Sequence, residues 1–248
     1  MSSSAHLILA RAFFGWDPEL FGLGFDVACH VGTLAAVLWY VRRDLAPLFA
    51  ALPAAVSGRD DESARLVRLI IAGTIPIIIV GLLAAEAIER SFRTPLVCAV
   101  TLTLGAAGMM LAERIGRGIK GATDMSPAGA FAIGCGQAAA LIPGMSRSGT
   151  TITIAMFMGV RREAAARFTF LMSIPAVATV AAKKGLELAK TGLDPSAGEL
   201  YLVGAVTSGI VGYVAVKHLI RYLANNPLHV FAAYRFALAA TVVLWLVA

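Results

Sequence analysis

The chain is poor in charged residues and in cysteine. Lys, Arg, Asp and Glu make up 15% of its 248 residues, against about 25% in an average soluble domain. Its apolar share is 58% and its mean hydropathy is +0.79. A soluble globule of this size leaves many of its atoms at the water boundary and could not hide so much apolar surface. The composition excludes soluble, disordered and disulfide-rich secreted proteins, and it predicts an integral membrane protein.

The few cysteines and the net charge carry little functional information. Cys29, Cys98 and Cys135 lie in apolar runs without a CxxC spacing or a His/Cys cluster, so we expect buried free thiols. The formal net charge is +6. Lys and Arg that flank membrane spans set the orientation of a chain in the bilayer, which explains this excess. The basic balance therefore does not indicate nucleic acid as a partner.

Six apolar stretches are long enough, or nearly so, to cross a bilayer, which takes about 20 residues. These stretches are 21–41, 69–88, 95–112, 168–182, 200–216 and 230–248. A further apolar stretch, 128–160, is interrupted by Pro-Gly at 143–144 and Ser-Arg-Ser-Gly at 146–149. Irregular backbone at membrane depth survives only inside protein or beside a wet cavity. We therefore predict an all-α polytopic fold with six transmembrane helices, in which 128–160 forms two re-entrant half-helices.

The distribution of Lys and Arg favours the re-entrant arrangement. If 128–160 returns to the side it came from, one side of the membrane carries 13 basic residues and the other 6. If it crosses fully, the counts become 11 and 8. Because cytoplasmic loops carry the excess of basic residues, the re-entrant arrangement fits better. It places on the cytoplasmic side the segments 42–68, 113–127, 161–167 and 217–229.

The sequence also contains a weak internal duplication within a single membrane domain. A shift of 144 carries Ser2 onto Ser146 and Ser4 onto Ser148, and a shift of 143 lays 25–32 beside 168–175. The halves, about 1–112 and 128–248, each contain a Ser-rich interruption followed by three spans. We call these interruptions the first break (residues 2–4) and the second break (residues 146–148). Because three is an odd number, the halves must have opposite topology. Inverted repeats of this kind bind a polar ligand near the midplane, where broken helices meet.

The second break has the residues of an anion site. An arginine inside an apolar segment is costly and marks a functional site by default. Arg147 lies where the second half-helix should begin, and free N–H groups and the helix dipole favour an anion there. Its guanidinium can grip phosphate or carboxylate through two parallel hydrogen bonds. The alternative is that Arg147 pairs with an acid such as Asp26 and only locks the bundle. We favour phosphate binding, with the predicted binding residues Ser146, Arg147, Ser148, Gly149 and Thr151.

The N-terminal break supplies the candidate reactive groups. A serine near a histidine can act as nucleophile with its base, so Ser3 and His6 are candidates, and His6 could itself attack phosphorus. Three further residues are candidates for lining the same cavity, namely Gln137, Asp26 and Ser173. Asp26 and Arg235 are intramembrane charges that are either functional or held in a structural pair, with each other or as another Arg–carboxylate pair. His30 is expected to be a hydrogen-bonding residue of the bundle.

The run GCGQAAALIPGMSRSGTT at 134–151, together with SSSAHLI at 2–8, resembles the bacterial undecaprenyl-diphosphate phosphatase family of the bacitracin-resistance type. The resemblance covers essentially the whole chain in collinear order. It implies a multi-pass inner-membrane enzyme that hydrolyses undecaprenyl diphosphate to undecaprenyl phosphate and phosphate. The step would recycle the lipid carrier for cell-wall synthesis, on the outer face, with a divalent cation such as Mg²⁺ or Ca²⁺. By position, Ser3, His6 and Arg147 match catalytic residues of the family.

The chain departs from the family at its start. The family carries an acidic motif on a helix just before the Ser-rich break, whereas this chain begins at Met1 directly on that break. The resemblance therefore predicts that the natural protein extends upstream of Met1 and carries metal-binding carboxylates there. The metal ligands within the chain stay unassigned.

A second class of function fits the same pattern. Inverted repeats that meet at broken helices are the usual build of secondary transporters. The alternative function is therefore a transporter or flippase that moves an anionic prenyl phosphate lipid without cleaving it. The sequence leaves the oligomeric state open, with a homodimer as one arrangement.

Overall fold

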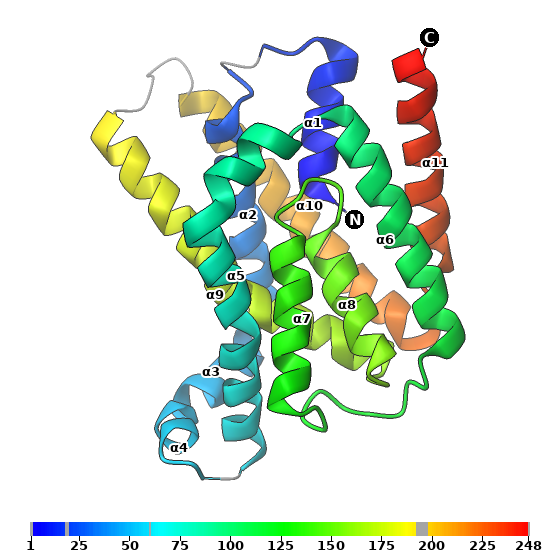
Figure 1. Cartoon of the computed structure of the whole chain (residues 1–248). Coiled ribbons are helices and arrows are strands. Elements are labelled where there is room, and N and C mark those ends of the chain that lie inside the picture. Colours follow the sequence, from blue (N-terminus) through cyan, green and yellow to red (C-terminus); the bar gives the residue numbers. More distant parts are fainter. Residues whose placement is uncertain (1, 18–19, 60, 192–197, 248) are drawn as a thin grey trace.

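The computed structural model describes residues 2–17, 20–59, 61–191 and 198–247, which contain helices and no strand (Figure 1). The helices are α1 (Ser3–Phe14), α2 (Leu23–Tyr40), α3 (Arg42–Ala50), α4 (Leu52–Val56), α5 (Glu62–Phe92), α6 (Pro95–Ile115), α7 (Pro127–Ala139), α8 (Arg147–Phe157), α9 (Arg162–Thr191), α10 (Gly198–Asn225) and α11 (His229–Val247). The predicted all-α fold is confirmed.

Several helices begin at residues that the sequence marks as starts. Thr94 precedes Pro95 and Ser126 precedes Pro127, and each hydroxyl accepts a hydrogen bond from the backbone N–H three residues on. A capping oxygen satisfies an N–H that has no partner inside the helix, and proline at the first helical position loses nothing by lacking one. The sequence therefore determines the residues at which α6 and α7 begin.

The described part of the chain has four helices that are long and apolar enough to span a membrane. These are α5, α6, α10 and α11, and the pair α2–α3, bent by 75°, would make a fifth. Five of the six predicted spans thus correspond to helices that meet this test, alone or as the bent pair. The sixth predicted span, 168–182, lies in the 30-residue α9, part of which is outside the residues that this test covers, so it stays a prediction. Phe168, Leu171 and Met172 of α9 are buried, so this part of α9 packs against protein.

Two half-length helices form the predicted re-entrant pair. With 13 residues in α7 and 11 in α8, their lengths are about 20 and 16 Å, well short of the roughly 30 Å of a bilayer core. The turn between them lies part-way up the bundle, and their other ends lie at the end where α3 and α4 are (Figure 1). The chain therefore enters and leaves this segment on the same side, as the distribution of basic residues predicts.

The two Ser-capped helices run in opposite directions. Ser2 accepts a hydrogen bond from the N–H of Ala5 at 3.4 Å at the start of α1, and Ser146 accepts one from Gly149 at 3.1 Å at the start of α8. Both starts lie inside the bundle, and from there α1 runs away from α3 and α4 while α8 runs toward them (Figure 1). This is the relation that an inverted repeat requires; the boundaries of the two repeats stay a prediction.

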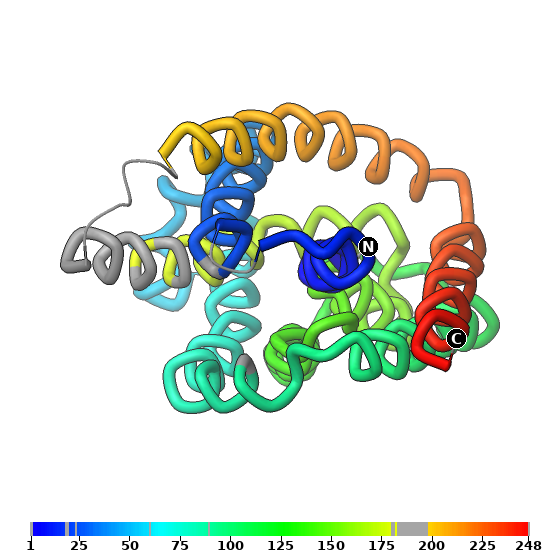
Figure 2. The backbone as a smooth tube through the Cα atoms, turned by 90° about the horizontal axis from the view of Figure 1, so that it is seen from above, coloured from blue at the N-terminus to red at the C-terminus, as the bar shows by residue number. Residues whose placement is uncertain are grey.

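Small residues bring the surrounding helices close together. Seen from above, α1 lies near the centre with the long helices around it, and α2 lies beside α10 (Figure 2). A Cβ at Gly32 of α2 would overlap the carbonyl oxygen of Ala205 in α10, and a Cβ at Gly134 of α7 would overlap that of Gly73 in α5. Glycine permits this backbone contact, which replaces hydrophobic driving force as a source of helix association in lipid. The re-entrant α7 is therefore held directly against α5.

Candidate functional site

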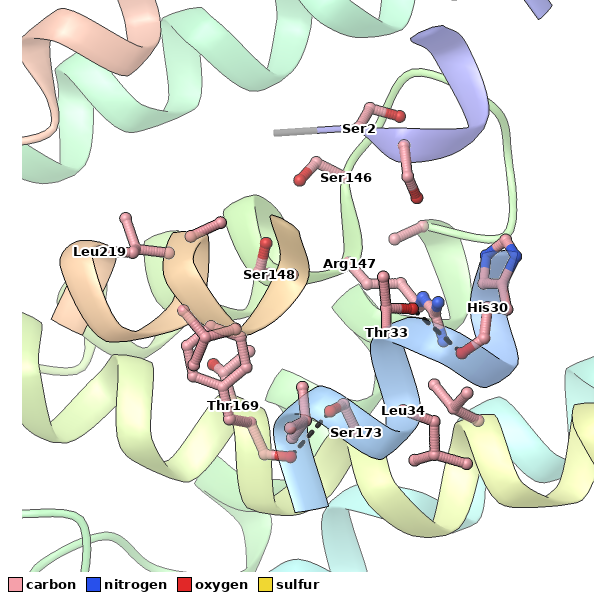
Figure 3. A pocket seen from close by; sticks show the side chains of 18 of the residues that line it. Ser2, His30, Thr33, Leu34, Ser146, Arg147, Ser148, Thr169, Ser173 and Leu219 are labelled. Atoms are coloured by element: carbon pink, nitrogen blue, oxygen red, sulfur yellow. Dashed lines mark hydrogen bonds between the residues drawn. The ribbon is translucent and has the colours of Figure 1, made fainter. Parts of the chain in front are cut away.

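A cavity of about 350 Å³ lies where the starts of α1 and α8 approach each other. Its remaining walls come from α2, α7, α9, α10 and α11. The polar residues of the lining, many of them drawn in Figure 3, are Ser2, Ser3, Ser4, His30, Thr33, Gln137, Ser146, Arg147, Ser148, Thr169 and Ser173. Both Ser-rich breaks thus contribute to one cavity, as the duplication predicts.

Arg147 is the charged residue of this lining. It is the first residue of α8, and its side chain points toward α2, where Thr33 and His30 lie (Figure 3). Within the described residues its guanidinium forms no hydrogen bond or ion pair, and no carboxylate lines the cavity. The alternative in which Arg147 pairs with Asp26 is therefore wrong. An uncompensated cation in a half-buried cavity favours an anionic ligand.

The start of α8 adds backbone donors next to this cation. Its first N–H groups, those of Arg147 and Ser148, have no partner inside the helix, and none of the described residues accepts from them. Such N–H groups, with the positive end of the helix dipole, form an anion-binding site. The hydroxyl groups of Ser146 and Ser148 lie in the same lining. The second break therefore presents a cation, free N–H groups and hydroxyl groups to one space.

Two of the predicted phosphate-binding residues are not at the cavity wall. The N–H of Gly149 donates to the Ser146 side chain and is thereby used for the helix cap. Thr151 is fully buried, and its hydroxyl donates to the carbonyl of Arg147 at 2.7 Å and accepts from Thr169 at 3.0 Å. Both residues therefore support the start of α8 from within, and Thr169 is the threonine of this network that lines the cavity.

Ser146 has an unusual backbone conformation. Its φ of 67° makes it, among the described residues, the only one other than glycine with a positive φ. A non-glycine residue in that region costs about 1–3 kcal/mol and persists only where its surroundings enforce it. The turn before α8 is therefore a strained segment held by contacts elsewhere in the bundle.

Gln137 brings an amide without a partner into the cavity. It is 0% exposed and lines the cavity, yet neither Nε2 nor Oε1 forms a hydrogen bond with a described residue. A buried polar group left unpaired costs about 1–3 kcal/mol. Since the amide has both a donor and an acceptor, a polar ligand inside the cavity would satisfy it.

The first break places the two predicted reactive residues differently. Ser3 is exposed and lines the cavity, whereas His6 does not line it. The Nδ1 of His6 lies 2.6 Å from the carbonyl oxygen of Ser2, and its Nε2 lies 2.7 Å from the hydroxyl of Tyr234. Because a carbonyl only accepts, Nδ1 is assigned the proton and Nε2 accepts from Tyr234. The predicted contact between Ser3 and His6 is not formed.

The two other intramembrane charges do not face the cavity and do not pair with each other. Asp26 is buried and accepts hydrogen bonds from Arg11 and Arg93, so its predicted place in the lining is wrong. Arg235 donates to backbone carbonyls, among them those of Leu102 and Gly144. The hypothesis of a mutual Asp26–Arg235 pair is therefore wrong, whereas the alternative of a structural Arg–carboxylate pair is confirmed for Asp26. Gln137 and Ser173, by contrast, line the cavity.

Sequence reasoning missed several polar residues of the lining. On α2 these are His30 and Thr33, and on α9 Thr169 joins Ser173. Residues three or four apart lie on one face of a helix, and this spacing is visible in the sequence. The Nδ1 of His30 donates to the carbonyl of Asp26 at 2.6 Å, which leaves its Nε2 without a partner among the described residues. The shift of 143 pairs His30 with Ser173, and both line the cavity from equivalent helices.

The cavity does not have the residues of a divalent cation site. Mg²⁺ and Ca²⁺ bind mainly to carboxylate and carbonyl oxygen atoms, and none of the described Asp or Glu residues lines the cavity. Across the described ranges, no three His, Cys, Asp or Glu side chains lie close enough to hold a metal ion. The described residues therefore do not fit the expected cation.

A re-entrant helix pair that carries an unpaired arginine into a polar cavity defines a multi-pass membrane protein that handles an anionic ligand. A profile of the family described as "Bacitracin resistance protein BacA" matches residues 1–241, and the chain belongs to that family. An undecaprenyl-diphosphatase of Rubrobacter xylanophilus is 42% identical, over 98% of this chain and 90% of its own length. Those of Moorella thermoacetica and Alcanivorax borkumensis are 41% and 39% identical, over 98% and 99% of this chain and 90% and 92% of theirs.

Proposed function

We propose that the protein hydrolyses undecaprenyl diphosphate to undecaprenyl phosphate and inorganic phosphate, and so recycles the lipid carrier for cell-wall synthesis. The family membership and the names of the relatives support this activity. The structural observation that carries it is Arg147, which has no counter-ion among the described residues and lies beside N–H groups at the start of α8 that none of them accepts from. A terminal phosphate would supply the negative charge and the acceptor oxygen atoms that these donors need as partners.

Binding of the terminal phosphate is assigned to the second break. Phosphoryl transfer is catalysed mainly by positioning and by neutralising charge on the transferred group. Arg147 offers two parallel N–H groups, and the hydroxyl groups of Ser146 and Ser148 add further donors from the same lining. Gln137 would contact the diphosphate or the water that attacks it.

The bond-breaking step is assigned to the first break. Ser3 is the predicted reactive residue that lines the cavity, and we assign to it either attack on the terminal phosphorus or orientation of a water molecule. If Ser3 attacks, a P–O bond forms between its hydroxyl oxygen and the terminal phosphorus, undecaprenyl phosphate leaves with the bridging oxygen, and water then cleaves the phosphoserine ester to release phosphate. If Ser3 orients water, the water oxygen bonds to the terminal phosphorus and undecaprenyl phosphate leaves in the same step. His6 would take part in proton movement together with the Tyr234 hydroxyl, to which its Nε2 is hydrogen-bonded.

The apolar part of the lining suits the prenyl chain. Val37 of α2, Leu219 of α10 and Phe231 of α11 lie in the same cavity as the polar residues. A lipid diphosphate carries a charged head directly on an apolar chain, so its site needs both surfaces within a few ångströms. The cavity therefore fits the head and the first isoprene units together.

The membrane location and the cation are further parts of the proposal. We place the protein in the bacterial inner membrane with the cavity open to the outer side, supported by the excess of Lys and Arg in the segments at the other end. Mg²⁺ or Ca²⁺ would be held chiefly by oxygen atoms of the diphosphate. Because the described residues supply no ligand set, no reaction step is assigned to the cation.

The test separates hydrolysis from transport. Purified full-length chain is incubated with undecaprenyl diphosphate, with and without Mg²⁺ or Ca²⁺, and phosphate release is measured. The same protein in liposomes is assayed for movement of a fluorescent prenyl phosphate between leaflets. Phosphate release that needs the diphosphate and is absent with undecaprenyl phosphate supports the proposal. Leaflet exchange without phosphate release under any condition would overturn it in favour of the transporter.

A further inference from the structure

Arg235 is a buried cation that the proposed reaction does not use directly. It lies in α11 and is 0% exposed, and it is the largest fully buried side chain among the described residues. Its guanidinium donates to the carbonyls of Thr101 at 3.1 Å and Leu102 at 3.2 Å, both in α6. It also donates to Gly144 at 3.0 Å and to Met145 at 3.3 Å, both in the turn before α8. Its partners are thus four backbone oxygen atoms, and none of the described carboxylates pairs with it.

The fold leaves a dedicated space for this guanidinium. A Cβ at Gly105 of α6 would overlap Nη2 of Arg235. Glycine in the interior of a helix destabilises the helix relative to alanine. At position 105 this cost is offset because the guanidinium of Arg235 occupies the space that a Cβ would need. α6 therefore admits the arginine and supplies two of its acceptors.

The contacts of Arg235 determine the shape of the turn that leads into the anion site. Together with Thr101, whose hydroxyl donates to the carbonyl of Pro143 at 2.6 Å, Arg235 fixes three successive carbonyls, those of residues 143–145. The C=O of one residue and the N–H of the next point in opposite directions across a trans peptide. Holding the Met145 carbonyl therefore directs the N–H of Ser146 away from Arg235. This restraint acts next to the strained φ of Ser146.

The position of Arg235 also affects the charge at the site. The guanidinium stays protonated in proteins and lies behind the turn, while Arg147 lies in front of it in the cavity. Two cations on either side of one short turn favour a multiply charged anion more than Arg147 alone would, because the surrounding protein screens charge weakly. A phosphate or diphosphate group matches this field better than a carboxylate.

We propose that Arg235 is a positioning residue for the phosphate site: it holds the backbone of residues 143–146 so that Ser146 and Arg147 face the cavity, and its charge raises the affinity for a diphosphate. This rests on the proposed function. The competing interpretation is that Arg235 only fastens α11 to α6, in which case its loss would affect stability and nothing else.

The experiment compares Arg235→Met and Arg235→Lys with a matched control, Arg11→Gln. The control removes another largely buried arginine, one that pairs with Asp26 and does not line the cavity, while Arg93 still holds that carboxylate. For each full-length variant we measure the melting temperature, its increase with added pyrophosphate, and kcat and KM for undecaprenyl diphosphate. The pyrophosphate measurement needs no turnover.

Arg235→Met should abolish protection by pyrophosphate and lower kcat/KM by about 100-fold, the effect of losing one preorganised donor set. Arg235→Lys keeps the charge but not the planar fork, so it should recover part of both losses. Arg11→Gln should lower the melting temperature and keep the protection. Where Arg235→Met does not fold, Gly105→Ala serves instead, because it displaces the guanidinium while keeping every charge, and it should weaken the protection by pyrophosphate.

The outcomes separate the two proposals. If Arg235→Met and Gly105→Ala lower the melting temperature but keep wild-type protection by pyrophosphate, Arg235 only fastens helices and the inference is overturned. If the wild type releases no phosphate but is protected by pyrophosphate, and Arg235→Met loses that protection, the proposed hydrolysis fails while the positioning role stands. A wild type without any protection by pyrophosphate would overturn the inference on its own.

Discussion

The two Ser-rich breaks share a serine-capped helix start and differ in their side chains. A shift of 144 residues lays Ser2-Ser3-Ser4 on Ser146-Arg147-Ser148, and all six residues line one cavity. In both breaks the first serine caps the helix that follows. At the middle position, however, one break has the hydroxyl of Ser3 and the other the guanidinium of Arg147. The two breaks therefore share the capped helix start, and they differ in chemistry at the residue after the capping serine, which is Ser3 in one and Arg147 in the other.

The breaks also differ in how firmly they are held. Three carbonyls of the turn before α8 are bound by Thr101 and Arg235, and Ser146 has a positive φ. The start of α1 is held by its cap and by His6, whose ring contacts the Ser2 carbonyl. A rigid turn suits a binding group that must be preorganised, whereas a reactive hydroxyl needs freedom to approach the phosphorus. The comparison therefore assigns binding to the second break and reaction to the first.

The largest effect is expected for Ser3→Ala. Loss of the reacting or water-orienting group should lower kcat by about 10²–10⁴-fold, because nothing else in the first break presents a hydroxyl at this position of the cavity. Protection of the protein by pyrophosphate in a thermal melt should stay at the wild-type level, since the binding residues are in the other break. Undiminished phosphate release by this variant would show that the reaction is not carried by the first break.

Arg147→Gln should give the reverse pattern with a slightly smaller effect. Removal of the cavity cation should lower kcat/KM by about 10²–10³-fold and should also abolish protection by pyrophosphate. Arg147→Lys keeps a point charge without the bidentate fork and should lie between the two. If Ser3→Ala and Arg147→Gln lowered binding and turnover alike, the division of labour between the breaks would be wrong.

Gln137→Met should stabilise the protein while weakening substrate binding. The substitution keeps the volume of the side chain and removes a buried amide that has no partner among the described residues, so the melting temperature should rise. If the amide contacts the substrate, its loss should raise KM by about 5–30-fold, the equivalent of one or two kcal/mol. A thermal melt and a KM measurement on the same sample check both signs. A rise in KM without the gain in stability would mean that the amide has a partner in the free protein.

The sequence was sufficient for features that depend on local pattern. The Pro-Gly turn at 143–144 and the arginine at 147, inside an apolar stretch, predicted the re-entrant pair and the cation at its tip. The duplication predicted that the two breaks meet. These features can be read from the sequence because a bilayer strongly disfavours backbone groups without hydrogen bonds and charged side chains without a function or a partner.

The sequence was insufficient where a side chain chooses among distant partners. Asp26 pairs with Arg93, 67 residues away, and His6 with Tyr234, 228 residues away. Arg235 suggested a carboxylate partner, yet it binds carbonyl oxygen atoms, which every residue has and which no sequence pattern marks. Thr151 has the right spacing to line the cavity but turns into an internal network. In each case the choice depends on packing between helices that are far apart in the chain.

The smallest effect is expected for Tyr234→Phe. This variant tests whether Tyr234 of α11 contributes to the reaction assigned to the first break. The variant removes the hydroxyl that donates to His6 Nε2, while Nδ1 keeps its contact with Ser2. A hydrogen bond of this kind is worth about 0.5–1.5 kcal/mol, so kcat should fall by about 2–12-fold. The decisive measurement is a double-mutant cycle with His6→Asn. If Tyr234 acts through His6, adding Tyr234→Phe to His6→Asn should cost nothing further. Additive losses would instead mean that the two residues act independently, and the first break would then consist of the serines alone.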